Sequence, residues 1–450
     1  MKILRNYIVN YSWFYAIIWW PITIAFYFFY RKIIVQGKEN IPKSTPVMFT
    51  PNHQNAAIDP YVLVATASAG QILFLSRADI FAKPLLAKIL QLIKILPIFR
   101  ERDGTDSLQK NNEIFNIAIE VLERKQTFCT FPEAKHHNKR FLLPLKKGIP
   151  RIAFSAEEKN DFKLGIQIVP VGIYYDQYAN SGGILHVIYG APIKVSDYAV
   201  MYNENQPKAI LTLRNDIAAS IKPLMIDIQN QEYNEFYEEL RYIYNNKMRQ
   251  TLNLKNKQAD RFVADKKIIE ILDKIFLDNE KEFLGLKNKT EEYCSMRNRA
   301  GILEISAEGS MSALEVFGNS LLMLILTPVY LYSWLVNFIP WLPSFFLKKK
   351  FEDPQFHSSV KFILGLILFP IFYGTLLLTT GLVFKSWLLL LLVFLSFFPA
   401  IIMFVNGKVW YRKLLSDWKF LLYRKSKLAS CLKLRDEIIK IMDGFFSSIL

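Results

Sequence analysis

The chain has 450 residues, 52% of them hydrophobic, which is long enough for two or three domains and too apolar for a disordered protein. Lysine and arginine number 56 against 40 aspartate and glutamate, and this balance favours anionic partners such as nucleic acid, anionic lipid headgroups or phosphorylated substrates. The three cysteines, Cys129, Cys294 and Cys431, form no C-x-x-C pair, so neither a disulfide framework nor a cysteine zinc site is indicated.

The first predicted element is an uncharged apolar run over residues 6–30. It exceeds the roughly 18 apolar residues needed for a membrane span. Lys2 and Arg5 precede it, as in a signal peptide, but the run is long, rich in Trp and Tyr, and lacks a small-residue cleavage site. We therefore predict a retained N-terminal membrane anchor over residues 1–32.

Residues 33–230 alternate between strand-like and helical patterns. Short apolar, strand-like runs lie at 47–50, 72–76, 95–99, 127–131, 166–174 and 186–190, and helical patterns lie at 61–69, 83–92, 107–125 and 148–158. This alternation predicts an α/β domain with a mixed, mostly parallel sheet flanked by helices. In such sheets, functional sites gather where strands end and helices begin.

The segment Asn52-His53-Gln54-Asn55-Ala56-Ala57-Ile58-Asp59-Pro60 follows the first of these strands. A histidine oriented by an aspartate can act as a general base towards a hydroxyl. At about 100° per residue, six positions turn roughly 240°, so His53 and Asp59 meet only if a turn intervenes. The alternative is that Asp59 caps the next helix and His53 is a polar loop residue. Asn52 is a further candidate for substrate binding.

Two later strand ends carry charged residues. Arg100 follows the run at 95–99, where its guanidinium can bind a phosphate or pair with Glu101 or Asp103. Glu133 follows the run at 127–131, where it can accept hydrogen bonds from a polyol or fix that arginine.

A basic loop follows Glu133 and carries four candidate phosphate ligands, Lys135, Arg140, Lys146 and Lys147. The alternative is a solvated basic loop without a ligand. A metal site at Glu133, His136 and His137 is disfavoured, because no further ligand cluster supports it, and we predict no metal.

Beyond residue 230 the composition changes. Residues 231–310 are charged and aromatic with helical spacing, which predicts a helical region whose charges mostly face solvent. Residues 311–450 hold three uncharged runs, 316–347, 362–384 and 386–407, followed by a basic tail. Because spans of this kind point to lipid, we expect a bilayer and no nucleic acid as partner.

Basic residues flank the apolar runs at 31–32, 348–350 and 408–450, which predicts that these flanks are cytoplasmic. If so, 316–347 enters and leaves on one face, as a re-entrant or interfacial helix pair broken at Pro328, Pro340 and Pro343. The alternative is one kinked full span. The two later runs then form a transmembrane hairpin, and the protein is a multi-pass membrane protein with its α/β domain on the cytoplasmic face.

Taken in order, these segments resemble the glycerolipid acyltransferase superfamily, which acylates glycerol 3-phosphate, dihydroxyacetone phosphate or lysophosphatidate. That family has a histidine and an aspartate separated by four residues, an arginine closing a second block, a Phe-Pro-Glu-Gly third block and a late Val-Pro strand. The counterparts here are His53 with Asp59, Arg100, Phe131-Pro132-Glu133-Ala134, and Val169-Pro170-Val171-Gly172. The resemblance covers about residues 33–230.

The chain departs from the family pattern at three places. Five residues separate His53 and Asp59, Lys94 stands where the second block usually begins with glycine, and Ala134-Lys135-His136 replaces Gly-Thr-Arg. Lys135, Arg140, Lys146 or Lys147 are candidates to replace the missing arginine. The five-residue spacing, and the segment from Asp353 to Lys361, resemble a branch that acylates glycerol 3-phosphate or dihydroxyacetone phosphate.

The resemblance implies that His53, oriented by Asp59, deprotonates an acceptor hydroxyl that attacks the thioester of acyl-CoA or acyl carrier protein, with no other cofactor. Arg100 and nearby lysines would hold the acceptor phosphate, and Glu133 would position it. The implied role is phospholipid biosynthesis; the alternatives are acylation of another lyso-lipid in remodelling or a non-catalytic lipid-binding scaffold. A channel or transporter is disfavoured because the apolar runs carry no charge.

Overall fold

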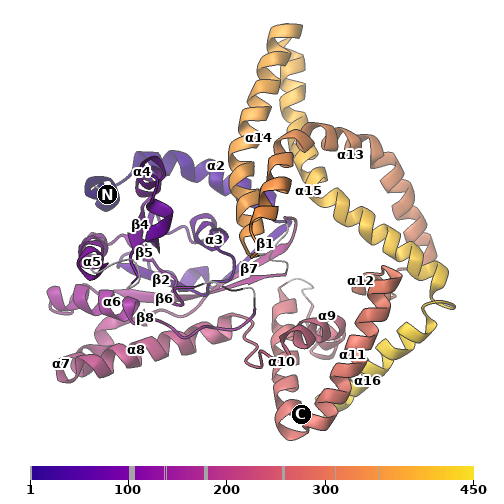
Figure 1. Ribbon diagram of the computed structural model, residues 1–450, viewed down its shortest axis with the longest axis horizontal. Helices are drawn as coiled ribbons and strands as arrows, with labels where there is room; N and C mark the ends of the chain where they lie inside the picture. Colours follow the sequence, from indigo (N-terminus) through magenta and orange to yellow (C-terminus); the bar gives the residue numbers. More distant parts are fainter. Residues whose placement is uncertain are drawn as a thin grey trace. The chain divides into compact units, whose positions relative to one another are not determined.

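The computed structural model describes residues 3–100, 107–135, 137, 139–176, 181–255, 259–309, 311–353 and 355–449. These residues divide into two compact units (Figure 1). The first contains residues 1–138, 142–227 and 341–370, and the second contains 139–141, 228–340 and 371–450. The first unit therefore begins before the predicted 33–230, ends its second segment at 227 and adds residues 341–370 from the C-terminal region.

A single mixed sheet forms the centre of the first unit. Its strands are β1 (Lys32–Gln36), β2 (Val47–Pro51), β3 (Ile72–Arg77), β4 (Ile95–Ile98), β5 (Thr127–Cys129), β6 (Gln167–Tyr175), β7 (Ile184–Tyr189) and β8 (Ile193–Lys194). Their order is β1-β7-β6-β2-β5-β3-β4, with β8 paired to β6. The run from β6 to β4 is parallel throughout, while β7 and β8 are antiparallel to β6. This confirms the predicted mixed, mostly parallel sheet.

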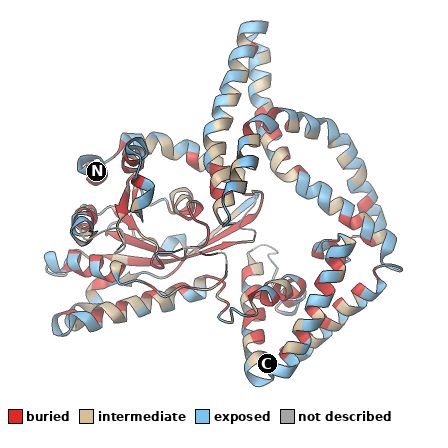
Figure 2. Ribbon diagram, in the orientation of Figure 1, coloured by how far each residue is buried: buried red, intermediate tan, exposed pale blue. Residues whose placement is uncertain are grey.

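Helices cover both faces of the sheet because its strands are apolar on both sides. The helices of this unit are α1 (Arg5–Val9), α2 (Trp13–Phe29), α3 (Ile58–Thr66), α4 (Pro84–Leu92), α5 (Ser107–Glu123), α6 (Gly148–Lys159), α7 (Ala199–Glu204), α8 (Gln206–Ile221) and the beginning of α14 (Gln355–Phe384). In β2, Met48 packs into the core with α5, α6 and α8, whereas Val47 and Phe49 pack into the core with α2, α3 and α14. The central strands β2, β5 and β6 are accordingly buried (Figure 2), whereas β1 and β8 are partly exposed.

The predicted N-terminal anchor forms two helices, α1 and α2, and not one. The apolar helix α2 is 17 residues long, and Ile22 and Phe26 on one side pack into the core of the sheet. Trp13, Ile17 and Trp20 on the same helix are exposed. One side of α2 therefore packs within the first unit, and another side presents an apolar surface. The membrane anchor stays a prediction.

The second unit is helical, as predicted for residues 231–310. It contains α9 (Asn234–Thr251), α10 (Asp260–Asp278), α11 (Glu280–Ala300), α12 (Glu304–Ala307) and α16 (Ala429–Ile449). Some of its charged side chains are buried, although the sequence analysis expected them mostly to face solvent. The buried carboxylate of Glu304 accepts from Arg297 at 3.0 Å and from Arg435 at 2.7 Å. Since Arg435 belongs to α16, the basic tail is in part a packed helix.

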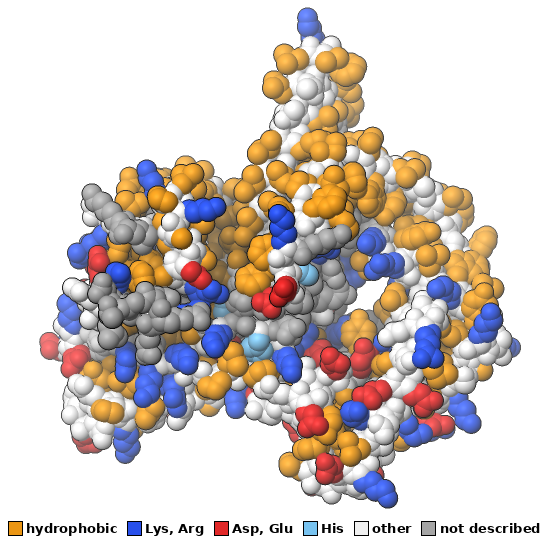
Figure 3. Space-filling model, viewed as in Figure 1, with side chains coloured by type: hydrophobic (Ala, Val, Ile, Leu, Met, Phe, Trp, Pro, Cys, Tyr) orange, Lys and Arg blue, Asp and Glu red, His pale blue; other side chains and the backbone are white. Residues whose placement is uncertain are grey.

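Three long apolar helices lie between α12 and α16: α13 (Ala313–Leu347), α14 and α15 (Trp387–Tyr423). Each is long and apolar enough to cross a membrane, and their side chains are largely exposed. Apolar side chains cover the projecting ends of α14 and α15 (Figure 3), where Tyr373 stacks on Phe397 at 4.1 Å. Residues 316–347 form one continuous helix across their prolines, and not the expected helix pair.

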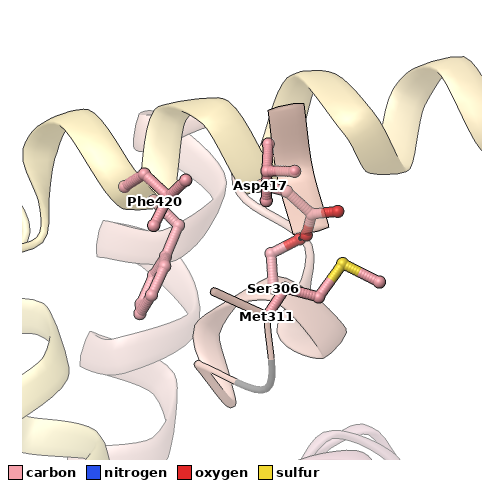
Figure 4. Close-up of a pocket in the computed structure, with 6 residues that line it drawn as sticks. Ser306, Met311, Asp417 and Phe420 are labelled. Carbon is pink, nitrogen blue, oxygen red and sulfur yellow. Dashed lines mark hydrogen bonds between the residues drawn. The ribbon is translucent and has the colours of Figure 1, made fainter. Parts of the chain in front are cut away.

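A small pocket lies where α12 meets α15 in the second unit (Figure 4). The Ser306 hydroxyl donates to Asp417 Oδ1 at 2.7 Å, and Lys413 pairs with the same carboxylate at 2.6 Å. The other lining residues are Met311, Val316, Phe420 and Leu421. These polar contacts fasten the end of the apolar helix α15 to the helical region.

Candidate active site

The structure brings His53 and Asp59 together directly after β2. Nδ1 of His53 lies 2.7 Å from Oδ2 of Asp59. The intervening turn reverses at Ala56, whose φ of 41° lies in the left-handed region, and α3 begins at Ile58. Asp59 makes no side-chain cap to α3, so the alternative of a helix cap is wrong.

The Asp59 carboxylate is fully buried and surrounded by donors. Besides His53, Oδ2 accepts the backbone N–H groups of Gln54 and Asn55, each at 2.9 Å, and Oδ1 accepts the Tyr175 hydroxyl at 2.5 Å. These partners suit an ionised carboxylate, which only accepts. With a proton on Nδ1 pointing at Asp59, Nε2 of His53 is left as the acceptor, which is the tautomer a general base requires.

The His53 ring is held from its other sides by the segment after β5. It stacks on Phe131 with ring centroids 4.1 Å apart, and its side chain retains 15% of its exposure. The backbone N–H of His53 donates to Glu133 Oε1 at 2.6 Å, while Glu133 Oε2 accepts the N–H of Leu143 at 2.9 Å. The ring is thus fixed yet reachable from solvent.

Glu133 and Asn52 have different surroundings from those expected of substrate ligands. The Glu133 side chain is fully buried against backbone donors, with Nε2 of His137 3.5 Å away. The Asn52 amide donates to the carbonyl of Ile173 at 3.1 Å and accepts its N–H at 2.7 Å. We therefore assign both residues a positioning role: Glu133 fixes the His53 backbone, and Asn52 joins β2 to β6.

Arg100 lies at the same edge of the sheet as His53, because both follow the carboxyl ends of parallel strands. Three strand spacings of about 4.8 Å separate β2 from β4, roughly 14 Å at the level of the backbone. Arg77, at the end of β3, hydrogen-bonds to Asp79, and this bond, with the nearby charge of Arg100, lowers the pKa of the Asp79 carboxyl. Two arginines therefore gather at the ends of adjacent strands.

The four basic residues after Glu133 separate into two groups. Lys135, Lys146 and Lys147 are exposed, and the Lys146 N–H donates to the carbonyl of Pro132 at 2.8 Å, which ties this loop to the strand end. Arg140 belongs to the second unit, where its buried guanidinium lies 2.6 Å from Glu238. Its contact with Glu238 gives Arg140 a structural role, so its prediction as a phosphate ligand is not supported.

The sequence analysis missed Tyr175 and Arg77, although both lie where a parallel strand ends. The predicted strand at 166–174 stopped one residue short of Tyr175. His136 and the loop at Glu101-Arg102-Asp103-Gly104 lie outside the described residues. Within the described residues, no cluster of three or more His, Cys, Asp or Glu side chains suits a metal ion.

An apolar recess lies beside α3. Its lining is Tyr15, Ile18, Trp19, Ile22, Pro60, Tyr61, Val64, Phe74, Ile93 and Ile95. Its empty volume is about 370 Å³, including space open to solvent. Pro60 and Tyr61 directly follow Asp59, so the recess and the His53–Asp59 pair share the first turn of α3.

Comparisons with known proteins match the segment that carries the His53–Asp59 pair. The family model described as Acyltransferase matches residues 32–174, the stretch that supplies His53, Asp59, Arg100 and Glu133. Residues 32–174 thus match an acyltransferase family model, in agreement with the resemblance to the glycerolipid acyltransferase superfamily. The sequence resemblance to this superfamily is thereby confirmed.

Two relatives align with the acyltransferase domain and its surroundings. Glycerol-3-phosphate O-acyltransferase 2 of Saccharomyces cerevisiae is 26% identical over 194 residues, 42% of this chain and 25% of that protein. The 1-acyl-sn-glycerol-3-phosphate acyltransferase of Borreliella burgdorferi is 26% identical over 164 residues, 36% of this chain and 58% of that protein. The chain thus spans about a quarter of the length of the Saccharomyces cerevisiae protein and somewhat over half of the length of the Borreliella burgdorferi protein.

One solved structure also matches the chain. The crystal structure of the 1-acyl-sn-glycerophosphate acyltransferase from Thermotoga maritima is similar over 47% of this chain and 79% of that one, with a TM-score of 0.35 and 18% identity.

Two departures of the acyltransferase domain from the family pattern have a backbone explanation. Ala134, where the third block usually has glycine, has a φ of 56°, and Lys94, where the second block usually begins with glycine, has a φ of 58°. Glycine adopts this left-handed region at no steric cost, whereas other residues are strained there. Glycine would therefore suit both positions of this chain.

Proposed function

We propose that this protein is a membrane-bound O-acyltransferase that transfers a fatty acyl group from acyl-CoA or acyl carrier protein to a hydroxyl of a glycerol-phosphate-type acceptor. The observation that carries the proposal is the 2.7 Å contact between His53 and the buried Asp59 inside a domain that matches the Acyltransferase family. The acceptor is glycerol 3-phosphate, dihydroxyacetone phosphate or lysophosphatidate, which places the reaction in phospholipid biosynthesis.

In the proposed reaction, Nε2 of His53 removes the proton of the acceptor hydroxyl as the oxygen attacks the thioester carbonyl carbon. The carbon–sulfur bond then breaks, and the thiolate leaves with the proton that His53 carries. Asp59 stabilises the imidazolium that exists between these steps. Tyr175 and the backbone N–H groups of Gln54 and Asn55 hold Asp59 in place, so the base is oriented before substrate binds.

The acceptor phosphate is proposed to bind the basic groups at the carboxyl edge of the sheet. Arg77 and Arg100 supply guanidinium groups that suit bidentate phosphate contacts, and Lys135, Lys146 and Lys147 are exposed on the adjoining loop. The names of both relatives contain glycerol 3-phosphate as substrate or as part of it, which supports an acceptor of this class.

The bilayer is proposed to supply or receive the lipid. Three helices are long and apolar enough to cross it, and exposed Trp13, Ile17 and Trp20 on α2 give the first unit an apolar surface. Aromatic and apolar side chains of this kind partition into membrane interfaces. The basic flanks favour the cytoplasmic face for the acyltransferase domain.

The test is an acyl-transfer assay with purified protein in lipid nanodiscs. Release of free thiol from acyl-CoA or acyl carrier protein is measured with glycerol 3-phosphate, dihydroxyacetone phosphate, lysophosphatidate or lysophosphatidylcholine, and the lipid product is identified by mass spectrometry. We expect thiol release that depends on a phosphorylated glycerol acceptor. Acylation of lysophosphatidylcholine alone would indicate lipid remodelling, and binding of lipid without thiol release from either donor would indicate a scaffold; both results contradict the proposal.

A further inference from the structure

The beginning of α14 packs inside the first unit, although it lies about 300 residues beyond the His53–Asp59 turn. Phe362 of α14 is 2% exposed and belongs to the core beneath β2. Its ring centroid lies 5.1 Å from that of Tyr61, 5.5 Å from that of Phe29 and 5.8 Å from that of Phe26. The start of this apolar helix is therefore held against α2 and α3.

One turn before Phe362, two serines contact the His53–Asp59 turn itself. The Ser358 hydroxyl donates to Asn55 Oδ1 at 2.5 Å, and Ser359 Oγ accepts the backbone N–H of Ala57 at 3.2 Å. Ser358 is fully buried and Ser359 is 4% exposed. Both bonds lie in a solvent-excluded site, where a lost partner leaves a polar group unsatisfied.

These contacts lie on either side of a strained backbone position in the turn. Ala56, between Asn55 and Ala57, has a left-handed φ of 41°, which costs energy for a residue with a Cβ. The turn is also what aims the N–H groups of Gln54 and Asn55 at Asp59 Oδ2. Two hydroxyls from α14 thus clamp the residues on either side of the strained position.

We propose that Ser358 and Ser359 are positioning residues that hold the His53–Asp59 pair in its reactive geometry. This role rests on the acyl transfer proposed above. It makes the acyltransferase domain incomplete without a segment of the C-terminal region, although the family match ends at residue 174. The serines bond to Asn55 and Ala57 and act through them.

The length of α14 permits this role together with a membrane span. Its 30 residues extend about 45 Å at 1.5 Å per residue, whereas a bilayer core of about 30 Å needs about 20. About ten residues therefore remain for contact with the first unit. The turn that positions the base and the predicted membrane span belong to one helix.

The test uses the full chain in nanodiscs, with Ser358→Ala, Ser359→Ala, the double variant and Asn55→Ala. Thr375→Ala is the matched control, because its exposed hydroxyl donates to Ile371 within the same helix and touches nothing in the turn. For each variant, kcat, the KM of both substrates and the thermal midpoint are measured. Misplacement of a catalytic group by about 1 Å lowers the rate by as much as a hundredfold.

We expect the double serine variant to lose about ten- to a hundredfold in kcat with both KM values unchanged, while Thr375→Ala keeps the kcat of the unmodified protein. Ser358→Ala and Asn55→Ala should be non-additive, because they remove the two ends of one bond. A kcat equal to that of the control, a loss confined to KM, or additive losses would overturn the positioning role alone. An unmodified protein without acyl transfer would overturn the proposed function and this role together.

Discussion

The phenol of Tyr175 gives a sharp test of how Asp59 is held. Tyr175 is fully buried at the end of β6 and donates to Asp59 Oδ1 at 2.5 Å. A hydrogen bond to a charged group contributes about 1.5–3 kcal/mol, and Tyr175→Phe removes it while keeping the ring. We expect the stability to fall by that amount. A share of about 1.4 kcal/mol that raises the activation free energy by displacing the His53–Asp59 pair lowers kcat about tenfold.

The assay compares kcat, KM and thermal midpoint for Tyr175→Phe and for Tyr189→Phe. Tyr189 is a matched control: it is buried on the neighbouring strand β7, and its hydroxyl lies 2.7 Å from that of Thr66, a neutral partner at the opposite end of α3 from Asp59. Both variants should lower the thermal midpoint, but only Tyr175→Phe should lower kcat, with KM unchanged. An equal kcat for the two variants would refute the argument that Tyr175 acts through Asp59.

Three further predictions concern the phosphate site, the strained backbone at Ala134 and the buried side chain of Lys94. Arg100→Ala should raise the KM of a phosphorylated acceptor with little change in kcat, and an unchanged KM would place the phosphate elsewhere. Ala134→Gly should raise the thermal midpoint, because glycine relieves about 1 kcal/mol of strain at a φ of 56°; a lower midpoint would contradict this. Burial lowers the pKa of Lys94 to about 8, below its value in the unfolded chain, so the unfolded chain binds more protons between pH 8 and about 10. Stability should therefore rise with pH in this window by up to about 2 kcal/mol, and Lys94→Met should lose that dependence; equal slopes for the two proteins would count against it.

Local pattern was enough to predict the sheet and its order of strands and helices. The six expected strands correspond to β2 to β7, because buried parallel strands are continuous apolar runs that stand out from the helices between them. The edge strand β1 (Lys32–Gln36) was missed: only its first residue fell in the predicted anchor, and its other residues carried no strand prediction because they directly follow the apolar run of α2. The two-residue strand β8 is too short to leave a pattern.

The site was predictable only where its residues are close in sequence. His53 and Asp59 are six positions apart, so a turn between them could be inferred from Asn55 and the two alanines. Tyr175 and Ser358 reach the same turn from 116 and 303 positions away, and such pairings depend on tertiary packing that no local pattern encodes. The segment around Ser358 left one signal, its resemblance to a branch of the family.

The sequence also did not reveal which polar side chains are buried. Glu133, Asn52 and Arg140 were predicted to face a substrate because they are polar residues beside a strand end or in a basic loop. In the structure, Glu133 and Asn52 bond to backbone groups, and Arg140 pairs with Glu238. A polar residue is buried when the chain supplies partners for it, and those partners lie far along the sequence.

The most direct test of the account is the acyl-transfer rate of His53→Ala beside the unmodified protein, both reconstituted in the same nanodiscs with equal thermal midpoints. A positioned general base contributes about 10²–10⁴ in rate. The account predicts that kcat falls by at least about a hundredfold for a phosphorylated glycerol acceptor. An unchanged kcat in the folded variant would contradict the assignment of His53 as the base.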